Sequence, residues 1–338
     1  MIALVASPGD LHARYIGQQL ERMGHRSCFM NTREFGRGAL IDYPIEGAAK
    51  IRAVDGGTIE IDDVRTVWHR RPNYGQIASG IRDADIRSFC REEWASSFDG
   101  LLLNLEARFV NPLLAEYAAV KPRQLHVAAE VGLRIPDTLI TNNPDCVAPF
   151  LEKHRGRVIH KALSVPNNQV LDTRQWTDDD TPALAELPLA PTMFQERIVG
   201  PADVRATVVG EEIFAARIAT AVGRNDVDSR FDLDVPYEAH ALPDPVIRSL
   251  LDLMRALGLV FGTIDMKITD DGDYVFFEVN PQGQFLYVEL LTKQPIARSL
   301  ARYLAQGPEG LPARAHRDET RPSSRATAGA EAMLPDSS

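Results

Sequence analysis

Hydrophobic and polar residues are arranged along the first part of the chain as expected for an α/β domain. The apolar run at residues 2–6 predicts a buried strand, and the amphipathic stretch at 11–23 predicts the helix that follows it. A second apolar run at 64–68 predicts another strand, and residues 83–105 have the pattern of a long helix. We therefore expect residues 1–110 to fold as an N-terminal α/β domain.

The rest of the chain divides into two further folded segments and a tail. Strands are predicted at residues 157–161 and 193–199, and the polar stretch between them at 172–191 is expected to be a mobile loop or a lid. The sequence predicts a helix over residues 244–257, because a proline stands in its first turn and a glycine follows its last residue. We predict a central lobe over 111–200, a C-terminal lobe over 201–306 and, where apolar residues become rare, a disordered tail over 307–338.

A β-hairpin that carries acidic residues is predicted in the C-terminal lobe. Two β-prone runs, 259–268 and 274–280, flank an acidic turn, and Asp271-Gly272 within it is a strong signal for a two-residue hairpin turn. Side chains alternate between the two faces of a strand, and directly opposed residues lie close together. Counting outward from the turn therefore brings three oxygen-bearing side chains to one face: Asp265, its opposite residue Glu278, and Asn280.

These three side chains allow two interpretations. Acidic residues are mostly exposed, so they could be solvated residues on an open face of the sheet. The neighbouring residues are apolar on both faces, however, and like charges directly opposite each other destabilise a sheet unless something neutralises them. Hard oxygen ligands suit Mg²⁺, which binds a few carboxylates and completes its shell with substrate phosphates. We therefore predict that Asp265, Glu278 and Asn280 are metal ligands.

Charge and composition narrow the choice of partners and of cellular location. The net charge of −10 and the lack of a basic run argue against a nucleic-acid partner. The 3 cysteines are scattered, which is typical of free thiols in a reducing cytosol rather than of a disulfide framework. No apolar stretch approaches the roughly 20 residues needed to cross a bilayer, and the N-terminal run lacks the features of a signal peptide. We expect a cytoplasmic protein without a membrane partner.

Two lysines stand where an anionic ligand is expected. Lys121 directly precedes a proline that suits a first helical turn, and Lys161 ends a β-prone run. Either lysine alone could be a solvated surface residue. A lysine that leaves an apolar strand loses solvation unless an anion meets it, however, and a nucleoside triphosphate would supply that anion.

The order and spacing of the polar residues between positions 110 and 305 resemble those of the ATP-grasp ligases. The residues that carry this resemblance are Lys121, Lys161, Gln195-Glu196-Arg197-Ile198, Asp203, Arg205, Arg217, Asp265, Glu278 and Asn280. The resemblance implies an ATP-grasp fold of mixed α/β and α+β character. An N-terminal pre-ATP-grasp domain would precede a central lobe and a C-terminal catalytic lobe, with ATP held between the two lobes.

The same resemblance implies roles for individual residues. Lys121 and Lys161 would contact the phosphates of ATP, and Asp203 would hold the ribose. The adenine hinge, acting largely through backbone groups, would be Gln195, Glu196, Arg197 and Ile198. Two Mg²⁺ ions would be bound by Asp265, Glu278 and Asn280.

Finer features are similar to those of the graspetide macrocyclases, which cross-link ribosomally made peptides of the microviridin type. The run Trp68-His69-Arg70-Arg71-Pro72 resembles the Trp-aromatic-Arg-Arg-Pro element of their N-terminal domain, with His69 where an aromatic ring is commoner. Residues 276–289 are similar to the C-terminal element of that family. Asp228-Ser229-Arg230 stands where the family tends to have Asp-Trp-Arg, so a stacking role there is in doubt.

Arginines are the candidates for cradling the transferred phosphoryl group, because the guanidinium fork matches its oxygens. The candidates are Arg205, Arg217 and Arg230, although one of the strand arginines could be an exposed residue instead. A three-residue loop at Gly210 would put Arg205 and Arg217 on one face of the sheet, whereas a two-residue loop would put them on opposite faces. The spacing does not choose between these loops.

Contacts with the substrate are expected from a second group of residues. Arg70 and Arg71 lie where a predicted strand ends in a proline turn, which is a common place for ligand contacts in an α/β sheet. One interpretation is that they meet the carboxylates of an acidic peptide, and the other is an ordinary solvated basic pair. Asp228 is grouped with them as a substrate contact.

The resemblance implies an ADP-forming ligase that activates a carboxylate as an acyl phosphate. We expect a peptide macrocyclase that joins Asp or Glu side chains to Ser, Thr or Lys side chains as ω-esters or ω-amides. Its partner would be a ribosomally synthesised precursor peptide with a leader and an acidic core, and the family suggests a homodimer. The alternatives are a carboxylate–amine ligase that adds an amino acid to a protein or small acid, and a non-catalytic nucleotide-binding module.

Overall fold

The structure is a computed structural model, and it describes residues 1–74, 80–163, 173–219 and 235–306. Three predictions fall on the other residues. The candidate substrate and phosphoryl contacts Asp228 and Arg230 lie outside the described residues, and so does the tail over 307–338. Residues 1–308 form one compact unit. The division of this unit at residues 110 and 200 stays a prediction.

A parallel sheet organises the N-terminal residues, with the strand order β2-β1-β6-β7. Helix α1 (Leu11–Arg22) follows β1, and it begins at Asp10, whose carboxylate accepts a hydrogen bond from the Ala13 backbone N–H. Helix α2 (Ala84–Leu103) precedes the last strand, so the β1–β2 and β6–β7 connections each contain an α-helix, as parallel connections usually do. The four strands are β1 (Ile2–Val5), β2 (Ser27–Met30), β6 (Thr66–His69) and β7 (Arg108–Val110).

A small antiparallel sheet and two short helical elements extend this domain. The sheet has the order β3-β4-β5, and its central strand is held on both sides by ladder hydrogen bonds. Its strands are β3 (Leu40–Asp42), β4 (Lys50–Arg52) and β5 (Thr58–Glu60), and the 3-10 helices are η1 (Thr32–Glu34) and η2 (Ile61–Asp63).

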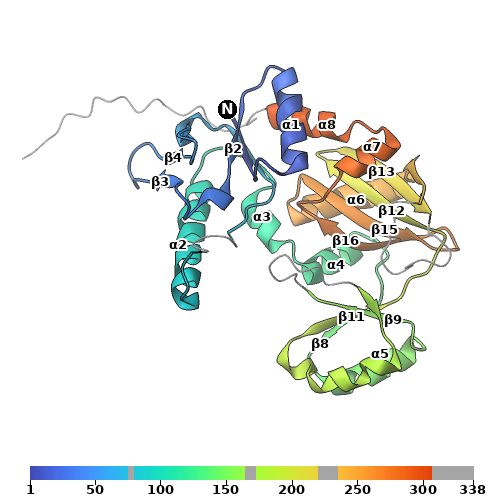
Figure 1. The fold of residues 1–338 in the computed structure, drawn as a ribbon. Coiled ribbons are helices and arrows are strands. Elements are labelled where there is room, and N and C mark those ends of the chain that lie inside the picture. Colours follow the sequence, from blue (N-terminus) through green and yellow to red (C-terminus); the bar gives the residue numbers. More distant parts are fainter. Residues whose placement is uncertain (75–79, 164–172, 220–234, 307–338) are drawn as a thin grey trace, which may run out of the picture. The chain divides into compact units, whose positions relative to one another are not determined.

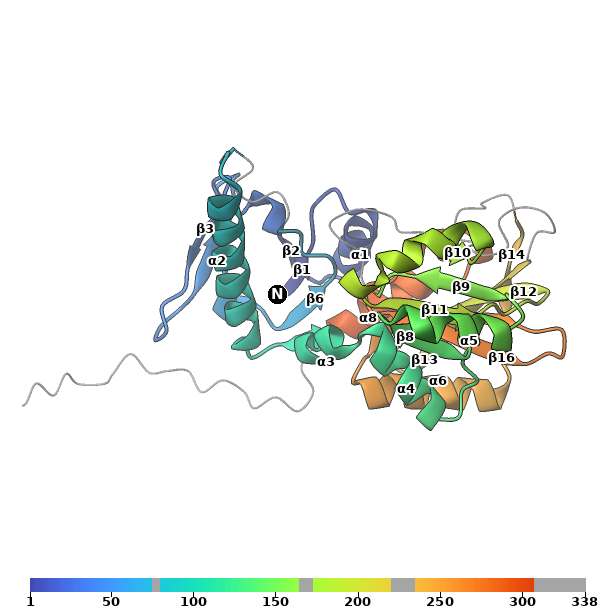
Figure 2. The same cartoon turned by 90° about the horizontal axis from the view of Figure 1, so that it is seen from below.

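The central residues form a further sheet, which α5 (Val147–Lys153) accompanies (Figure 2). The sheet order is β10-β9-β11-β8. Helices α3 (Leu113–Ala118) and α4 (Lys121–Glu130) lead into it. The remaining elements are β8 (Thr138–Thr141), η3 (Pro144–Cys146), β9 (Val158–Lys161), β10 (Arg174–Gln175), η4 (Asp178–Ala185), η5 (Leu187–Leu189) and β11 (Thr192–Glu196).

The stretch predicted to be a mobile loop or a lid contains regular secondary structure in its described part, residues 173–191. It contains one short strand and two 3-10 helices. Trp176 and Leu187 from this stretch are buried in the core of the central lobe, together with Phe194 of β11. These few apolar residues attach the segment to the lobe, although its composition is mostly polar.

The C-terminal lobe is built on an antiparallel sheet with the order β14-β13-β12-β15-β16. Helix α6 (Asp244–Leu257) covers one face with α4, where Leu250 and Leu257 pack against Met266 and Phe276 of the sheet (Figure 1). The strands are β12 (Ala202–Val209), β13 (Glu212–Ala219), β14 (Tyr237–His240), β15 (Phe261–Ile268) and β16 (Tyr274–Asn280), and the last helices are α7 (Leu286–Thr292) and α8 (Ile296–Ala305).

Helices α1 and α8 lie side by side and join the two ends of the described chain (Figure 1). Ile16 of α1 and Trp68 of β6 belong to the same buried cluster as Phe261 of β15 and Leu300 of α8. The N-terminal sheet and the C-terminal lobe therefore share one core. No helix in the described ranges is long and apolar enough to span a membrane.

Candidate active site

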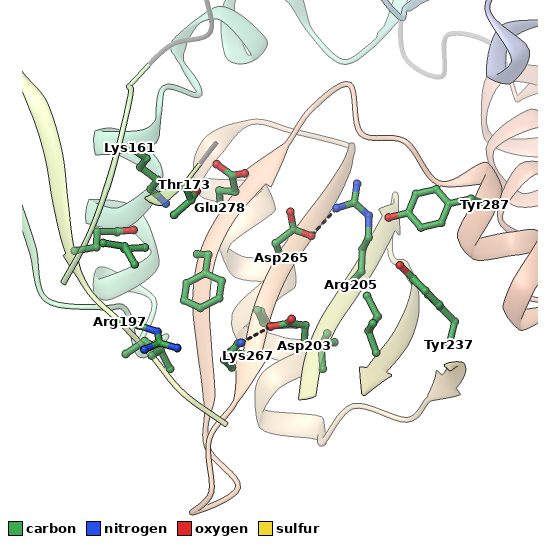
Figure 3. A pocket seen from close by; sticks show the side chains of 17 residues that line it. Lys161, Thr173, Arg197, Asp203, Arg205, Tyr237, Asp265, Lys267, Glu278 and Tyr287 are labelled. Carbon is green, nitrogen blue, oxygen red and sulfur yellow. Dashed lines mark hydrogen bonds and ion pairs between the residues drawn. The ribbon is translucent and has the colours of Figure 1, made fainter. Parts of the chain in front are cut away.

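A pocket opens on the polar face of the C-terminal sheet and is closed on its other side by β9 and β11 of the central lobe (Figure 3). Cross-strand pairing explains why polar groups gather there, because Arg205 of β12 lies opposite Asp265 of β15, and Asp203 lies opposite Lys267. Alternation sends the intervening residues to the core on the other face. Predicted site residues that line the pocket are Lys161, Gln195, Arg197, Ile198, Asp203, Arg205, Asp265 and Glu278.

The predicted pairing of Asp265 with Glu278 is confirmed, although the hairpin reaches it by another route. The turn has three residues rather than two, since Thr269 and Asp273 are bonded and Gly272 takes a left-handed φ of 84°. A β-bulge then shifts the register between Asp265 and Met266. The longer turn and the bulge cancel, so the two carboxylates lie opposite each other as predicted.

Each of the two opposed carboxylates has a cationic neighbour. Nη1 of Arg205 donates to Oδ1 of Asp265 at 2.7 Å, and Nζ of Lys121 lies 3.3 Å from Oε2 of Glu278. Asn280 continues the same strand, and its Oδ1 accepts a hydrogen bond from the Gln282 backbone N–H at 2.9 Å. The cations reduce the repulsion that two facing carboxylates would otherwise create.

The donor set of these residues fits Mg²⁺. Among the described residues no three His, Cys, Asp or Glu side chains are grouped to hold a metal, so the candidate set consists of two carboxylates and one amide. Carboxylate and amide oxygens are hard ligands, and Mg²⁺ is usually bound by one or two carboxylates together with substrate phosphates and water. Asp265, Glu278 and Asn280 could therefore hold the ion, with water and the phosphates of a substrate completing its shell.

The end of the pocket at β11 suits a flat heterocycle. Gln195 is 1% exposed and donates through Nε2 to Thr138 Oγ1, while its Oε1 has no hydrogen-bond partner among the described residues. A buried oxygen without a partner is costly unless a ligand donates to it, and the amino group of adenine is such a donor. Ile159 and Phe277 supply apolar lining here.

Three of the four residues predicted for the adenine hinge, Gln195, Arg197 and Ile198, line the pocket. The side chain of Glu196 does not line the pocket, because alternation on β11 turns it away from Gln195 and Arg197. The Glu196 backbone N–H donates to Asp137 O at 2.9 Å, and the Arg197 N–H donates to Arg157 O at 2.9 Å. A base in the pocket would therefore use the other backbone groups of the hinge.

The structure corrects the assignment of Arg217. The β12–β13 turn has two residues, so Val204 pairs with Arg217 and Arg205 pairs with Ala216. Arg217 is therefore on the face opposite Arg205, where burial and the charge of Arg217 lower the pKa of His240. Arg217 does not line the pocket, and we remove it from the candidate catalytic residues.

The structure also corrects the role of Arg70. Its side chain is 0% exposed, so it is neither a solvated residue nor available to a peptide on the surface. Its Nη1 donates to the Gln282 carbonyl oxygen, Nε lies 3.8 Å from Oδ2 of Asp10, and the guanidinium lies over the Trp68 ring. Burial lowers its pKa to about 10. Arg71 is exposed and remains a candidate for peptide contacts.

Several residues of the site escaped the sequence analysis. Lys267 is 5% exposed and lies with Nζ 3.0 Å from Oδ1 of Asp203, so the residue predicted to hold the ribose is held by a lysine. Lys267 lies two residues after Asp265 on the same strand, so alternation of side chains could have placed it on the same face of the sheet as Asp265. Tyr237 and Tyr287 line the pocket beside Arg205, with their rings 5.8 Å apart, and no local pattern marked them (Figure 3).

The fold matches several solved structures along most of its length, whereas no protein-family model and no curated protein sequence matches the chain. Macrocyclase MdnC from Microcystis aeruginosa MRC, solved with its precursor peptide MdnA, has a TM-score of 0.82 and 30% identity, over 90% of this chain and 99% of MdnC. Macrocyclase MdnB from the same organism has a TM-score of 0.78 and 27% identity, over 90% and 99% of the two chains. The ATP-grasp ligase PsnB, solved with a variant of its minimal precursor, Mg and ADP, has a TM-score of 0.73 and 25% identity, over 90% and 97%.

Proposed function

Because the chain belongs to the family of ATP-grasp macrocyclases that includes MdnC and MdnB, we propose that it closes rings in a ribosomally made precursor peptide. It is an ATP-grasp ligase and uses ATP and Mg²⁺. The observation that carries the proposal is the pair of opposed carboxylates, Asp265 and Glu278, in the pocket that Gln195 also lines. The likeness to enzymes solved with precursor peptides supports a precursor peptide as the partner, and we propose that this peptide has a leader and an acidic core.

The reaction would join an Asp or Glu side chain to a Ser, Thr or Lys side chain. A carboxylate oxygen of the peptide attacks the γ-phosphorus of ATP, ADP leaves, and an acyl phosphate forms. The hydroxyl or amine then attacks the carbonyl carbon, loses its proton, and displaces phosphate. The product is an ω-ester or an ω-amide, and each ring closure removes one water from the peptide and converts one ATP to ADP and phosphate.

The residues of the site would act mainly by position and charge, since phosphoryl transfer leaves little covalent chemistry to the protein. Arg205 would stabilise charge on the transferred phosphoryl group, because its fork presents several donors in one plane. Lys121 and Lys161 would contact the phosphates, and Asp203 with Lys267 would meet the ribose. Arg230, Asp228 and Arg71 stay candidates for the peptide and its acyl phosphate.

The metal ions would be held by Asp265, Glu278 and Asn280, and we propose two of them. Bound Mg²⁺ supplies positive charge that neutralises the phosphate oxygens during transfer. The release of Glu278 from Lys121 and of Asp265 from Arg205 would free both carboxylates for this purpose and both cations for the nucleotide. We also propose a cytoplasmic homodimer.

The intact mass of the peptide tests this function. A short precursor peptide with a leader and an acidic core, of the kind proposed here as the substrate, is incubated with the enzyme, ATP and Mg²⁺. We expect the peptide to lose whole waters, with one ADP formed for each, and we expect the loss to disappear in the variant Glu278→Gln. Unchanged peptide mass, with ATP consumed when free amino acids are added, would instead indicate a ligase that joins separate molecules.

The variant Glu211→Gln serves as the matched control. Glu211 lies in the β12–β13 turn, its side chain is 70% exposed, and it pairs only with surface residue Arg255 among the contacts of the described chain. Exposed ion pairs of this kind contribute little to the stability of a protein. Glu211→Gln should therefore close rings at the rate of the wild type, and a comparable loss in both variants would show that the effect of Glu278→Gln is not specific to the pocket.

A further inference from the structure

The loop over residues 281–285, which joins β16 to α7, is held by the N-terminal part of the chain. This loop directly follows the candidate metal ligand Asn280, and helix α7 after it brings Tyr287 to the pocket. The N-terminal side chains that hydrogen-bond to the loop or to the first residue of α7 come from four different elements or connections: His12, Arg70, Asn111 and Glu116.

His12 makes the contact at the start of α7. Its Nε2 lies 3.2 Å from the backbone nitrogens of both Phe285 and Leu286, and its ring packs edge-to-face on Phe285 with centroids 5.0 Å apart. A backbone N–H can only donate, so Nε2 must carry the lone pair and the ring must be neutral with its proton on Nδ1. Nδ1 lies 3.9 Å from Oδ1 of Asp10.

The surroundings of His12 keep the ring neutral. The side chain is 13% exposed, and the charged groups around it are Asp10, Arg70, Arg71 and Arg205. Burial and the three arginines lower its pKa to about 4, and Asp10 opposes them only in part. A protonated His12 would lose its acceptor and add a fourth cation to this cluster.

The loop that His12 holds is connected to the reacting end of the pocket. The Gln284 carbonyl oxygen accepts a hydrogen bond from Nη2 of Arg205 at 3.1 Å, while Nη1 of the same arginine donates to Asp265. The Arg205 guanidinium also lies 5.7 Å from the centroid of the Tyr287 ring. The position of the 281–285 loop therefore sets the direction of Arg205.

We propose that His12 is a positioning residue of the ligation reaction, which acts as a neutral hydrogen-bond acceptor for Phe285 and Leu286 and thereby fixes the loop that orients Arg205. The role rests on the proposed function, in which Arg205 stabilises the transferred phosphoryl group. His12 itself does not line the pocket. Its effect is expected on the rate of the chemical step rather than on nucleotide binding.

Three substitutions distinguish the role of the hydrogen-bond acceptor of His12 from the role of its ring. His12→Gln keeps an oxygen about where Nε2 lies, His12→Asn keeps an amide oxygen that is too short to reach the amides, and His12→Phe keeps the ring without an acceptor. His25→Ala is the control, because His25 is exposed beyond the other end of the same helix. Thermal melting shows which variants fold.

Hydrogen–deuterium exchange measures the proposed contact without any substrate. We expect the amides of Phe285 and Leu286 to exchange at least about fivefold faster in His12→Phe and His12→Asn, as the loss of a hydrogen bond implies. Exchange in His12→Gln and His25→Ala should stay near that of the wild type. Unchanged exchange in both the Phe and the Asn variants would overturn the proposal.

Steady-state kinetics of peptide-dependent ADP formation measure the consequence. We expect kcat to fall about tenfold in His12→Phe and His12→Asn with KM for ATP within about twofold, and His12→Gln to recover most of the loss. Activity kept in His12→Phe but lost in His12→Gln and His12→Asn would assign the role to ring packing and overturn the acceptor, and equal impairment of all three variants would also overturn it, because a restored acceptor would then have no effect. A wild-type enzyme that forms no ADP with peptide would count against the proposed function, while the exchange experiment would still decide the role of His12 in holding the loop.

Discussion

Arg205 connects the parts of the site at the scale of single residues. Its two terminal nitrogens donate in different directions, one to the Asp265 carboxylate and one to the Gln284 carbonyl oxygen. It is also 7% exposed, so its charge acts in surroundings where water screens it weakly. A lysine offers a single point charge on a flexible stem and cannot make both contacts with the same geometry.

The substitution Arg205→Lys should therefore lower kcat for ring closure by at least about tenfold, although it conserves the charge. The control is Arg255→Lys, because Arg255 also donates from both terminal nitrogens to two partners, the carboxylates of Asp252 and Glu211, but on the surface. That variant should keep the activity of the wild type. Peptide mass and ADP release measure both variants, and full activity of Arg205→Lys would show that the fork geometry is dispensable.

Local patterns predicted the residues of the site whose partners lie nearby in sequence. Asp265 and Glu278 sit on adjacent strands of one hairpin, so turn chemistry and alternation were enough to pair them. His12 contacts a backbone amide 273 residues further along the chain, and no periodicity carries information over that distance. Arg70 was assigned wrongly for the same reason, because its burial depends on the distant loop at Gln282.

At the scale of elements, the hairpin β15–β16 and the loop after it show how closely the backbone is packed around the site. The sequence predicted the two strands correctly but neither the three-residue turn nor the β-bulge. A two-residue turn and a three-residue turn followed by a bulge give the same pairing of Asp265 with Glu278, so the sequence pattern does not distinguish them. Behind this hairpin, Gly283 lies against Thr263 of β15. A Cβ atom at Gly283 would come within 2.4 Å of the Thr263 Cβ and 3.1 Å of the Asn280 carbonyl oxygen.

Gly283→Ala should therefore destabilise the protein by about 1–3 kcal/mol, the usual cost of overpacking a tight site, and should reduce ring closure because Asn280 must shift. Gly100→Ala is the matched control, since a Cβ at Gly100 within α2 meets nothing within 4 Å. It should stabilise the protein by about 0.5–1 kcal/mol, because alanine favours a helix over glycine. Urea unfolding compares the two variants, and equal stability would contradict the close approach at Gly283.

At the scale of the whole molecule, the ends of the described chain depend on each other. Periodicity suggested an N-terminal domain separate from the C-terminal lobe, and each set of elements does form its own sheet. The structure adds a common core in which Leu4 and Ile16 pack with Phe285 and Leu304. Sequence could assign these residues to buried faces but not to each other, because an apolar face does not specify which other face covers it.

The shared core and the buried His12 at its polar edge predict that acid weakens the described unit in part through this histidine. The pKa of His12 is about 4 in the folded protein against an ordinary 6.5, so between these pH values the unfolded chain binds a proton that the folded protein does not. The free energy of unfolding should therefore fall as the pH falls from about 6.5 to about 4, by on the order of 1–3 kcal/mol from this group. Carboxylates with lowered pKa values, such as Asp137, and the histidines His160 and His240, whose pKa values are also lowered, add their own acid dependence. The readout is therefore the difference between wild type and His12→Gln in urea unfolding across this range. His12→Gln cannot bind this proton, so its free energy of unfolding should change less with pH than that of the wild type. Parallel plots of the free energy of unfolding against pH would contradict a neutral, buried His12.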